Sequence, residues 1–230
     1  MRAELSVVIP TLNAAEALPG CLAALTEGLQ AGLIRELVIS DGGSADATRE
    51  IADAAGAVLL AGPPSRGGQL RRGAATAEGE WLLFLHADTR LADGWAAVVR
   101  AQMKSGRPGY FKLGFDAAGL APALVSGWAN LRSRLFHLPY GDQGLLVSRT
   151  DYDAAGGYPD IPIMEDVALA RRLGGRLQAM PLRVSTSAAR YRRDGWLRRG
   201  SGNLILLLRY LSGTSPERLL AHYRGPAGQA

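Results

Sequence analysis

The stretch EWLLFLHAD, residues 80–88, decides the fold. Its apolar residues run directly into His86, Ala87 and Asp88, so a short hydrophobic segment ends on an imidazole and a carboxylate. Short apolar runs bounded by turn residues are typical of strands that a parallel sheet buries on both faces. The end of such a strand lies at the edge of the sheet where open α/β folds bind ligands. On a strand that continues to residue 88, alternation puts the side chains of His86 and Asp88 on the same face.

Three segments of the same kind precede this one. The runs ELSVVIP (4–10), RELVISD (35–41) and AVLLAG (57–62) predict strands, and helical patterns over residues 14–29, 46–55 and 68–77 separate them. This alternation predicts an α/β fold of Rossmann-like type, with a mostly parallel central sheet and helices on both faces. Farther along, the pattern predicts strands at 109–115 and 143–149, a helix at 164–174, and a mostly helical tail over 196–224 that restarts at Pro216.

Composition narrows the class of protein. The chain has 230 residues, 47% hydrophobic and 20% charged, which suits one sizeable globular domain. Its one cysteine, Cys21, permits no intramolecular disulfide, and its apolar surroundings predict a small buried side chain. The apolar N-terminal run is too short for a signal peptide, and no run of about 18 apolar residues predicts a membrane span. We therefore expect a cytoplasmic protein.

The charge is distributed unevenly. Residues 171–224 contain twelve arginines and two acids, a net charge of +10, whereas the rest of the chain carries −5. A basic third on an acidic body indicates an anionic partner, and membrane phosphate, nucleotide phosphate and nucleic acid all qualify. Nucleic acid is disfavoured because the arginines are not interleaved with aromatic residues that could stack on bases. A solvated arginine-rich face is the alternative that needs no partner.

Polar or glycine-rich segments follow the predicted strands. Asp41 lies at a strand tip, where its carboxylate can accept a hydrogen bond from a uracil N–H or a ribose hydroxyl. The segment GPPSRGG (62–68) supplies positive charge at Arg66, and a helix that opens near Gly68 offers backbone N–H groups to an anion. No G-x-G-x-x-G follows the first strand, which argues against a nicotinamide enzyme.

Two groups of side chains can carry chemistry. Mg²⁺ and Mn²⁺ take one or two carboxylates together with phosphate oxygens, so Asp88 is a candidate ligand, and His86 can add a nitrogen that Mn²⁺ tolerates. Glu165 and Asp166 stand at a predicted helix start. Adjacent acids on a helix point about 100° apart, so one can face a ligand while the other supports it. Each acid also has a purely structural reading, as a turn cap or as a complement to the helix dipole.

Four segments together carry a family resemblance. They are LSVVIPTLNAAEALPGCLAAL (5–25), ELVISDGGSADATREIA (36–52), RGGQLRRGAATAEGEWLLFLHADT (66–89) and GGYPDIPIMEDVALARRL (156–173). Over nearly all of residues 4–175 the chain resembles the inverting glycosyltransferases of family 2, which have the GT-A fold. GDQGLLVSR (141–149) and the arginine-rich tail are similar to a compact bacterial subgroup, some of whose members are assigned to arsenosugar biosynthesis. The resemblance implies one domain over 1–230, with a nucleotide-sugar-binding half at 1–105, an acceptor and catalytic half at 106–195, and a basic helical tail at 196–230.

The resemblance also implies roles for single residues. A nucleotide-sugar donor would contact Pro10, Thr11, Asn13, Asp41, Arg66, Gln69, Arg192 and Arg193. Asp88 would be the Mn²⁺ or Mg²⁺ ligand of the family's D-x-D motif, in which His86 here replaces the first acid. Asp166 would be the catalytic base with Glu165 beside it, Asp142 and Gln143 would lie by the acceptor, and residues 191–196 would form a basic lid over the diphosphate.

These roles describe an enzyme that moves a sugar with inversion to an acceptor hydroxyl on a small molecule or a lipid-linked compound. UDP-sugars are the first donors to consider because Asp41 suits the uracil N–H, and guanine stays open. The alternative is a non-catalytic module on the same fold that binds nucleotide or a membrane surface. The apolar segment LILLLRYL (204–211) can pack on its own core, form a homodimer contact, or lie on the inner face of the membrane. We expect no nucleic-acid partner.

Overall fold

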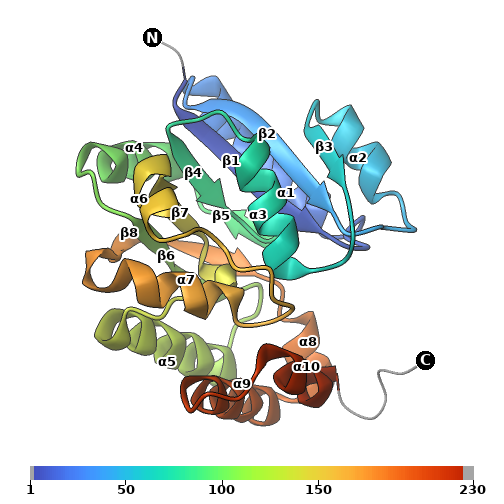
Figure 1. Cartoon of the computed structure of the whole chain (residues 1–230), viewed down its shortest axis with the longest axis vertical. Coiled ribbons are helices and arrows are strands. Elements are labelled where there is room, and N and C mark those ends of the chain that lie inside the picture. The colour runs from blue at the N-terminus through green and yellow to red at the C-terminus, as the bar shows by residue number, and fades with distance from the viewer. Residues whose placement is uncertain (1–2, 225–230) are drawn as a thin grey trace.

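The structure is a computed structural model that describes residues 3–224, and in this part of the chain eight strands form one sheet (Figure 1). The strands are β1 (Leu5–Thr11), β2 (Ile34–Asp41), β3 (Val58–Ala61), β4 (Trp81–Phe84), β5 (Thr89–Leu91), β6 (Gly109–Phe115), β7 (Leu145–Ser148) and β8 (Gln178–Thr186). The α-helices are α1 (Leu18–Gln30), α2 (Thr48–Ala54), α3 (Arg66–Thr76), α4 (Trp95–Lys104), α5 (Leu120–Phe136), α6 (Arg149–Ala154), α7 (Glu165–Leu173), α8 (Ala189–Asp194), α9 (Trp196–Leu211) and α10 (Pro216–Arg224). Two 3₁₀ turns, η1 (Gly141–Gln143) and η2 (Gly174–Arg176), complete the described elements.

The sheet has the order β3-β2-β1-β4-β7-β6-β8-β5. Its first four strands are parallel, as the alternation of strands and helices predicts. Beyond them, β7 is antiparallel to both β4 and β6. Strands β6 and β8 are parallel to each other, and β5 is antiparallel to β8. The α/β fold with a parallel nucleus is therefore confirmed, and the far half of the sheet is mixed.

The two faces of the sheet carry separate hydrophobic cores. In β1, Val7 and Ile9 pack with α1 and α4 on one face, whereas Val8 packs with α3, α6 and α7 on the other. Cys21 of α1 lies in the first core and is 1% exposed, as its apolar surroundings predict. Because both faces are covered, the apolar strand runs of the first half are continuous rather than alternating.

The structure corrects the end of the fourth strand. β4 ends at Phe84, and the chain then turns, with the Thr89 N–H donating to the His86 carbonyl at 3.0 Å. The prediction that strand alternation puts His86 and Asp88 on one face is therefore wrong. The chain leaves the sheet here because it continues into β5, which pairs with β8 at the far edge.

A third, smaller core joins the C-terminal helices to the body. It contains Ile163 and Val167 from the α7 region and Leu206, Leu207 and Leu219 from α9 and α10. Figure 1 shows α5, α9 and α10 together at the end of the molecule away from α1 and α2. Within residues 3–224, none of the helices combines the length and hydropathy needed to cross a bilayer.

Candidate active site

Two adjoining clefts lie at the carboxyl ends of β1 and β4. The large cleft has a volume of about 1330 Å³ and is lined by the end of β1, the start of α3, the 86–88 turn and the helices α8 and α9. The small cleft, of about 130 Å³, is lined by η1, the start of α7 and the α8–α9 region. Both clefts share Arg66, His86, Asp88 and Arg190. This is the edge of the sheet at which α/β folds bind ligands.

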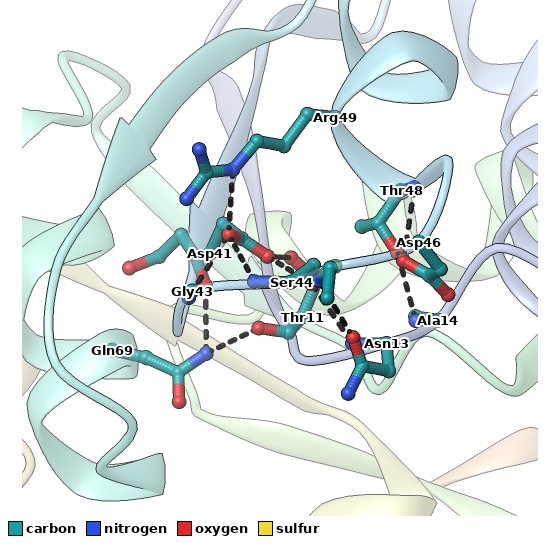
Figure 2. A network of polar contacts seen from close by, with 12 residues as sticks. Thr11, Asn13, Ala14, Asp41, Gly43, Ser44, Asp46, Thr48, Arg49 and Gln69 are labelled. Atoms are coloured by element: carbon teal, nitrogen blue, oxygen red, sulfur yellow. Dashed lines mark hydrogen bonds and ion pairs between the residues drawn. The ribbon is translucent and has the colours of Figure 1, made fainter.

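A polar network holds one wall of the large cleft in place (Figure 2). The carboxylate of Asp41 is buried and accepts hydrogen bonds from Thr11 Oγ1, the backbone N–H groups of Gly43 and Ser44, and Arg49 Nε, all at about 3 Å. Burial acts to raise the pKa of Asp41, but the Ser44, Arg49 and Thr11 hydrogen bonds outweigh it and lower the pKa to about 2. Asp41 therefore fixes the 41–44 loop against β1 and does not itself line either cleft.

The end of β1 and the residues directly after it face the large cleft. Pro10, Thr11 and Asn13 all line it. Asn13 has a φ of 50°, a left-handed conformation that asparagine tolerates better than most residues. Its side-chain oxygen accepts from the Ala45 N–H at 2.9 Å, and its own N–H donates to Ser44 Oγ at 2.8 Å (Figure 2). The two loops that follow β1 and β2 thus form one rigid rim.

The start of α3 joins the two halves of the chain. Gln69 donates from Nε2 to the backbone carbonyls of Thr11 (2.7 Å) and Ser40 (2.9 Å), which ties α3 to both strand ends. The N–H of Gly67 donates to the Ile161 carbonyl at 3.2 Å, and a Cβ at Gly67 would lie 2.0 Å from the Pro159 carbonyl oxygen. The prediction that this helix offers free N–H groups to an anion is wrong at Gly67, because the glycine admits the 159–161 loop instead of a ligand.

His86 and Asp166 meet across Gly141. The Gly141 N–H donates to Asp166 Oδ2 at 2.8 Å, and the Val167 N–H donates to Asp166 Oδ1 at 2.7 Å. A Cβ at Gly141 would lie 2.4 Å from His86 Nε2, so only glycine lets the imidazole lie this close to the η1 backbone. Burial, together with the charges of Arg66 and Arg190, lowers the pKa of His86 to about 3 against the opposing charge of Asp166. The imidazole is therefore neutral at neutral pH.

Glu165 and Asp166 point in different directions, as helical spacing predicts. Asp166 lines the small cleft, whereas Glu165 is 1% exposed and lies behind it, 3.6 Å from Arg66 Nε. Burial and then the charge of Asp166 raise the pKa of Glu165 to about 8, and Arg66 opposes this shift without reversing it. The preceding Met164 has a φ of 67°, a strained conformation for a side chain of this size, and it turns the chain so that α7 presents Asp166 to the cleft.

Asp142 lies in the small cleft opposite this pair. Its Oδ1 is buried and has no hydrogen-bond partner among residues 3–224. Burial raises the pKa of Asp142 to about 6, with the charges of Asp166 and Asp88 adding to the shift and that of Arg132 opposing it. A buried carboxylate oxygen without a partner is costly in a folded chain, and Glu165 Oε2 is a second such oxygen; of the two residues, only Asp142 lines the small cleft and can meet a ligand there.

Besides Asp41, two further predicted contact residues lie away from both clefts. Gln143 is fully buried, where its Oε1 accepts from Ser133 Oγ at 2.7 Å and its Nε2 donates to the Phe111 carbonyl at 3.1 Å. Arg192 points outward and donates to the Asp116 carbonyl at 3.1 Å. The structure therefore gives Gln143 a structural position and separates Arg192 from Arg193, which does line the large cleft.

Several further residues line the clefts that the sequence pattern did not single out. Arg190 lines both clefts and stands three positions before Arg193 on α8. Arg199, Asn203 and Leu206 also line both clefts from one face of α9. The four-residue and three-residue steps between them are the helical signal that would have grouped them. Residues 191–196, predicted as a lid, end α8 and begin α9, and the rings of Tyr191 and Trp196 both meet the Phe115 ring edge-on.

The donor set fits a hard divalent cation only in part. Asp88 and the neutral His86 line both clefts, and Asp142 leaves a buried oxygen unused nearby. Within residues 3–224 no three His, Cys, Asp or Glu side chains are grouped closely enough to hold an ion by themselves. One or two protein ligands are typical of Mg²⁺ sites in which substrate phosphates complete the coordination, so these residues are compatible with an ion that arrives with a diphosphate.

Comparison with solved structures identifies the fold. S. aureus TarS (residues 1–349, in complex with UDP-GlcNAc) superimposes with a TM-score of 0.60 and 16% sequence identity, over 80% of this chain and 58% of that one. Glucosyl-3-phosphoglycerate synthase from Mycobacterium tuberculosis, in complex with Mn²⁺, UDP and glucosyl-3-phosphoglycerate, superimposes with a TM-score of 0.58 and 20% identity, over 80% of this chain and 70% of that one. Both are glycosyltransferases, and the GT-A fold predicted from the sequence is confirmed.

Sequence comparison identifies the family. A curated relative, the PGL/p-HBAD biosynthesis glycosyltransferase of Mycobacterium tuberculosis (strain ATCC 25618 / H37Rv), is 40% identical over 103 residues, which cover 41% of this chain and 40% of the relative. The match thus spans well under half of the relative's length. The model of the family described as glycosyl transferase family 2 matches residues 6–128, more than half of the chain, a region that spans β1 to β6 apart from Leu5 and includes the cleft residues between positions 10 and 88. The chain belongs to glycosyl transferase family 2.

Proposed function

We propose that the protein transfers a sugar from a UDP-sugar to an acceptor hydroxyl, with inversion at the anomeric carbon. The observation that carries the proposal is the meeting of Asp166, His86 and Asp88 in the small cleft, which opens beside a large cleft walled by arginines. An oriented carboxylate next to a cationic cleft is what a displacement with a diphosphate leaving group requires.

The large cleft suits the donor. Pro10, Thr11, Asn13 and Gln69 line the end where a nucleoside would lie, and Arg66 and Arg190 supply charge for a diphosphate. UDP as the nucleotide is supported by the UDP and UDP-GlcNAc complexes of the two structural relatives. Because Asp41 is buried, we assign it a supporting role: it holds the rim of this cleft and does not contact the nucleobase.

The small cleft suits the reaction. Asp166 would remove the proton from the acceptor hydroxyl as that oxygen forms its bond to the anomeric carbon. The bond from this carbon to the diphosphate oxygen breaks, and its electron pair leaves with the diphosphate, so one displacement inverts the centre. The two backbone N–H groups on Asp166 fix the direction of its carboxylate. Asp142 would accept a hydrogen bond from the acceptor through its unpartnered oxygen.

A divalent cation, Mn²⁺ or Mg²⁺, held by Asp88 and His86 would supply further positive charge to the leaving diphosphate. The Mn²⁺ complex of glucosyl-3-phosphoglycerate synthase supports this assignment by analogy of fold. Calorimetric titration of UDP and GDP with and without Mn²⁺ tests it. We expect UDP to bind the wild type tightly only with Mn²⁺ and Asp88→Ala to lose that dependence. Binding of neither nucleotide in the presence of Mn²⁺ would refute the donor site.

The role of Asp166 as catalytic base is tested separately. Slow hydrolysis of UDP-glucose or UDP-GlcNAc serves as the assay, because water takes the place of the acceptor and the acceptor need not be known. We expect Asp166→Asn to bind UDP as the wild type does and to release UDP from these sugars at least about 100-fold more slowly. Asp93→Asn, an exposed acid outside both clefts, is the matched control and should behave as the wild type. An unchanged rate in Asp166→Asn would show that this carboxylate is not the base.

A further inference from the structure

Helix α5 presents its apolar side chains to solvent. Leu120, Leu124 and Leu135 are 84%, 69% and 59% exposed, and Trp128 and Leu131 are each 46% exposed. With 100° between successive residues, these five positions fall within an arc of about 80° on one side of the helix. A stripe of this kind normally faces a core, so its exposure calls for a physical explanation.

The opposite side of α5 explains how the helix is held without burying that stripe. Asn130 accepts from the Leu113 N–H at 2.7 Å and donates to the Leu113 carbonyl at 3.0 Å, which fastens α5 to β6. Arg132 donates to the Leu138 carbonyl at 3.0 Å, and Ser133 donates to Gln143 Oε1 at 2.7 Å. The polar face is therefore the inner face, and the apolar stripe has no partner among residues 3–224.

Helix α9 extends the apolar surface. Leu197, Leu208 and Leu211 are 82%, 57% and 41% exposed and lie on one side of α9, while Leu206 and Leu207 are buried in the third core. The two helices lie side by side (Figure 1). A Cβ at Gly200 of α9 would be 3.7 Å from Val125 Cγ2 of α5, an ordinary van der Waals distance, so the two helices pack directly on each other here. We call the exposed residues 120, 124, 128, 131, 135, 197, 208 and 211 the apolar α5–α9 surface.

Charge selects the partner of this surface. Neither α5 nor α9 contains an acidic residue, and three arginines are exposed on them: Arg134 on α5, and Arg198 and Arg209 on the side of α9 that also lines the large cleft. A second copy of the chain placed on the same surface would bring arginines against arginines. An anionic lipid surface offers an apolar layer for the leucines and phosphates for the arginines, which is how interfacial helices bind membranes.

We propose that the apolar α5–α9 surface docks the protein on an anionic bilayer, with α5 and α9 lying in the interface. Ile205 and Arg209 of α9 also line the large cleft, so the docked bilayer lies beside that cleft. This last point rests on the proposed function: a lipid-linked acceptor could then reach the adjoining small cleft without leaving the membrane. The docking itself needs no nucleotide and no turnover, so its test is independent of the glycosyl transfer.

Sedimentation with vesicles tests the docking. We expect the full chain to bind phosphatidylglycerol vesicles and to bind phosphatidylcholine vesicles weakly. Leu124→Ser with Leu131→Ser should bind the anionic vesicles at least about tenfold more weakly, since each leucine loses most of its transfer free energy. Both side chains are exposed in the free protein, so the double variant should fold with an unchanged melting temperature. Leu29→Ser, a 59% exposed leucine on α1, is the matched control and should bind as the wild type does.

A second readout does not depend on those variants. Brominated phosphatidylglycerol should quench tryptophan fluorescence in the wild type and quench Trp128→Phe less, because Trp81 and Trp95 are buried in the core and the Trp196 ring packs against Phe115 and Tyr191. Equal binding of the double variant and the control to anionic vesicles would overturn the proposal. Failure of the wild type to bind anionic vesicles would overturn it too. A wild-type dimer that the double variant dissociates, with no vesicle binding, would assign the surface to self-association and overturn it as well.

Discussion

Glu165→Gln is expected to stabilise the protein increasingly as the pH rises from 5 to 8. Burial raises the pKa of Glu165 from 4.5 to about 8, so the unfolded chain releases this proton at a lower pH than the folded chain does. The stabilising contribution of protonated Glu165 is therefore fully present below pH 4.5 and is lost as the pH rises towards 8. Each pKa unit corresponds to 1.36 kcal/mol, which gives a loss on the order of 3 kcal/mol between pH 5 and pH 8. Glutamine cannot ionise and avoids the loss.

Urea unfolding at pH 5, 6, 7 and 8 measures this effect. The difference in unfolding free energy between the wild type and Glu165→Gln cancels the contributions of His86 and Asp142, which both proteins share. A loss of about 3 kcal/mol is large against the 5–15 kcal/mol that stabilises a typical domain. Glu50→Gln, exposed on α2, is the control and should show no such trend. A difference that stays constant to within about 1 kcal/mol would mean that Glu165 is ionised beside Arg66, and the reasoning from burial would fail.

The glycine contacts give two further predictions. Gly141→Ala puts a Cβ 2.4 Å from His86 Nε2, so the imidazole must move. UDP-sugar hydrolysis should then fall at least about tenfold, with little change in melting temperature. Full activity would show that the position of His86 is unimportant. Gly67→Ala puts a Cβ 2.0 Å from the backbone carbonyl of Pro159 and should destabilise the fold by about 1–3 kcal/mol. Gly127→Ala in α5 meets no atom within 4 Å and should instead stabilise it by roughly 0.5–1 kcal/mol; equal effects of these two substitutions on urea unfolding would contradict the packing argument.

The first half of the fold is predictable from the sequence for a physical reason. Strands β1 to β4 are buried on both faces, so each appears as an unbroken apolar run between turn residues, and the predicted bounds lie within a few residues of the observed ones. The exception is the end of β4. The apolar run continues into Leu85, so it gives no sign that β4 ends at Phe84.

The second half is less predictable because its elements depend on distant partners. β8 is only partly buried and contains Pro181, and its place is set by pairing with β6 and β5. α5 is held by Asn130, Arg132 and Ser133 through hydrogen bonds, so its apolar periodicity gives no information about which face meets the core. The sequence analysis assigned no helix there and no strand at β8.

The candidate site divides in the same way. The acids at 88 and 166 stand next to strand and helix ends, where local pattern singles them out, and both lie in the small cleft. The unpartnered oxygen of Asp142 and the inward direction of Arg190 depend on how η1 and α8 pack, which no local pattern encodes. The roles of these residues stay predictions until the binding and hydrolysis experiments are done.

The pairing of β5 with β8 limits how this protein can be recombined. Residues 89–91 follow the His86–Asp88 turn directly, yet their ladder partners are residues 184–186, just before α8 and Arg190. A chimera that takes residues 1–105 from one homologue and 106–195 from another would therefore join a β5 to a foreign β8. The segment 106–195 therefore cannot be exchanged as a unit at the midpoint of the chain while residues 89–91 stay with the N-terminal segment. Shuffled libraries built on this scaffold should keep these two strands from the same parent.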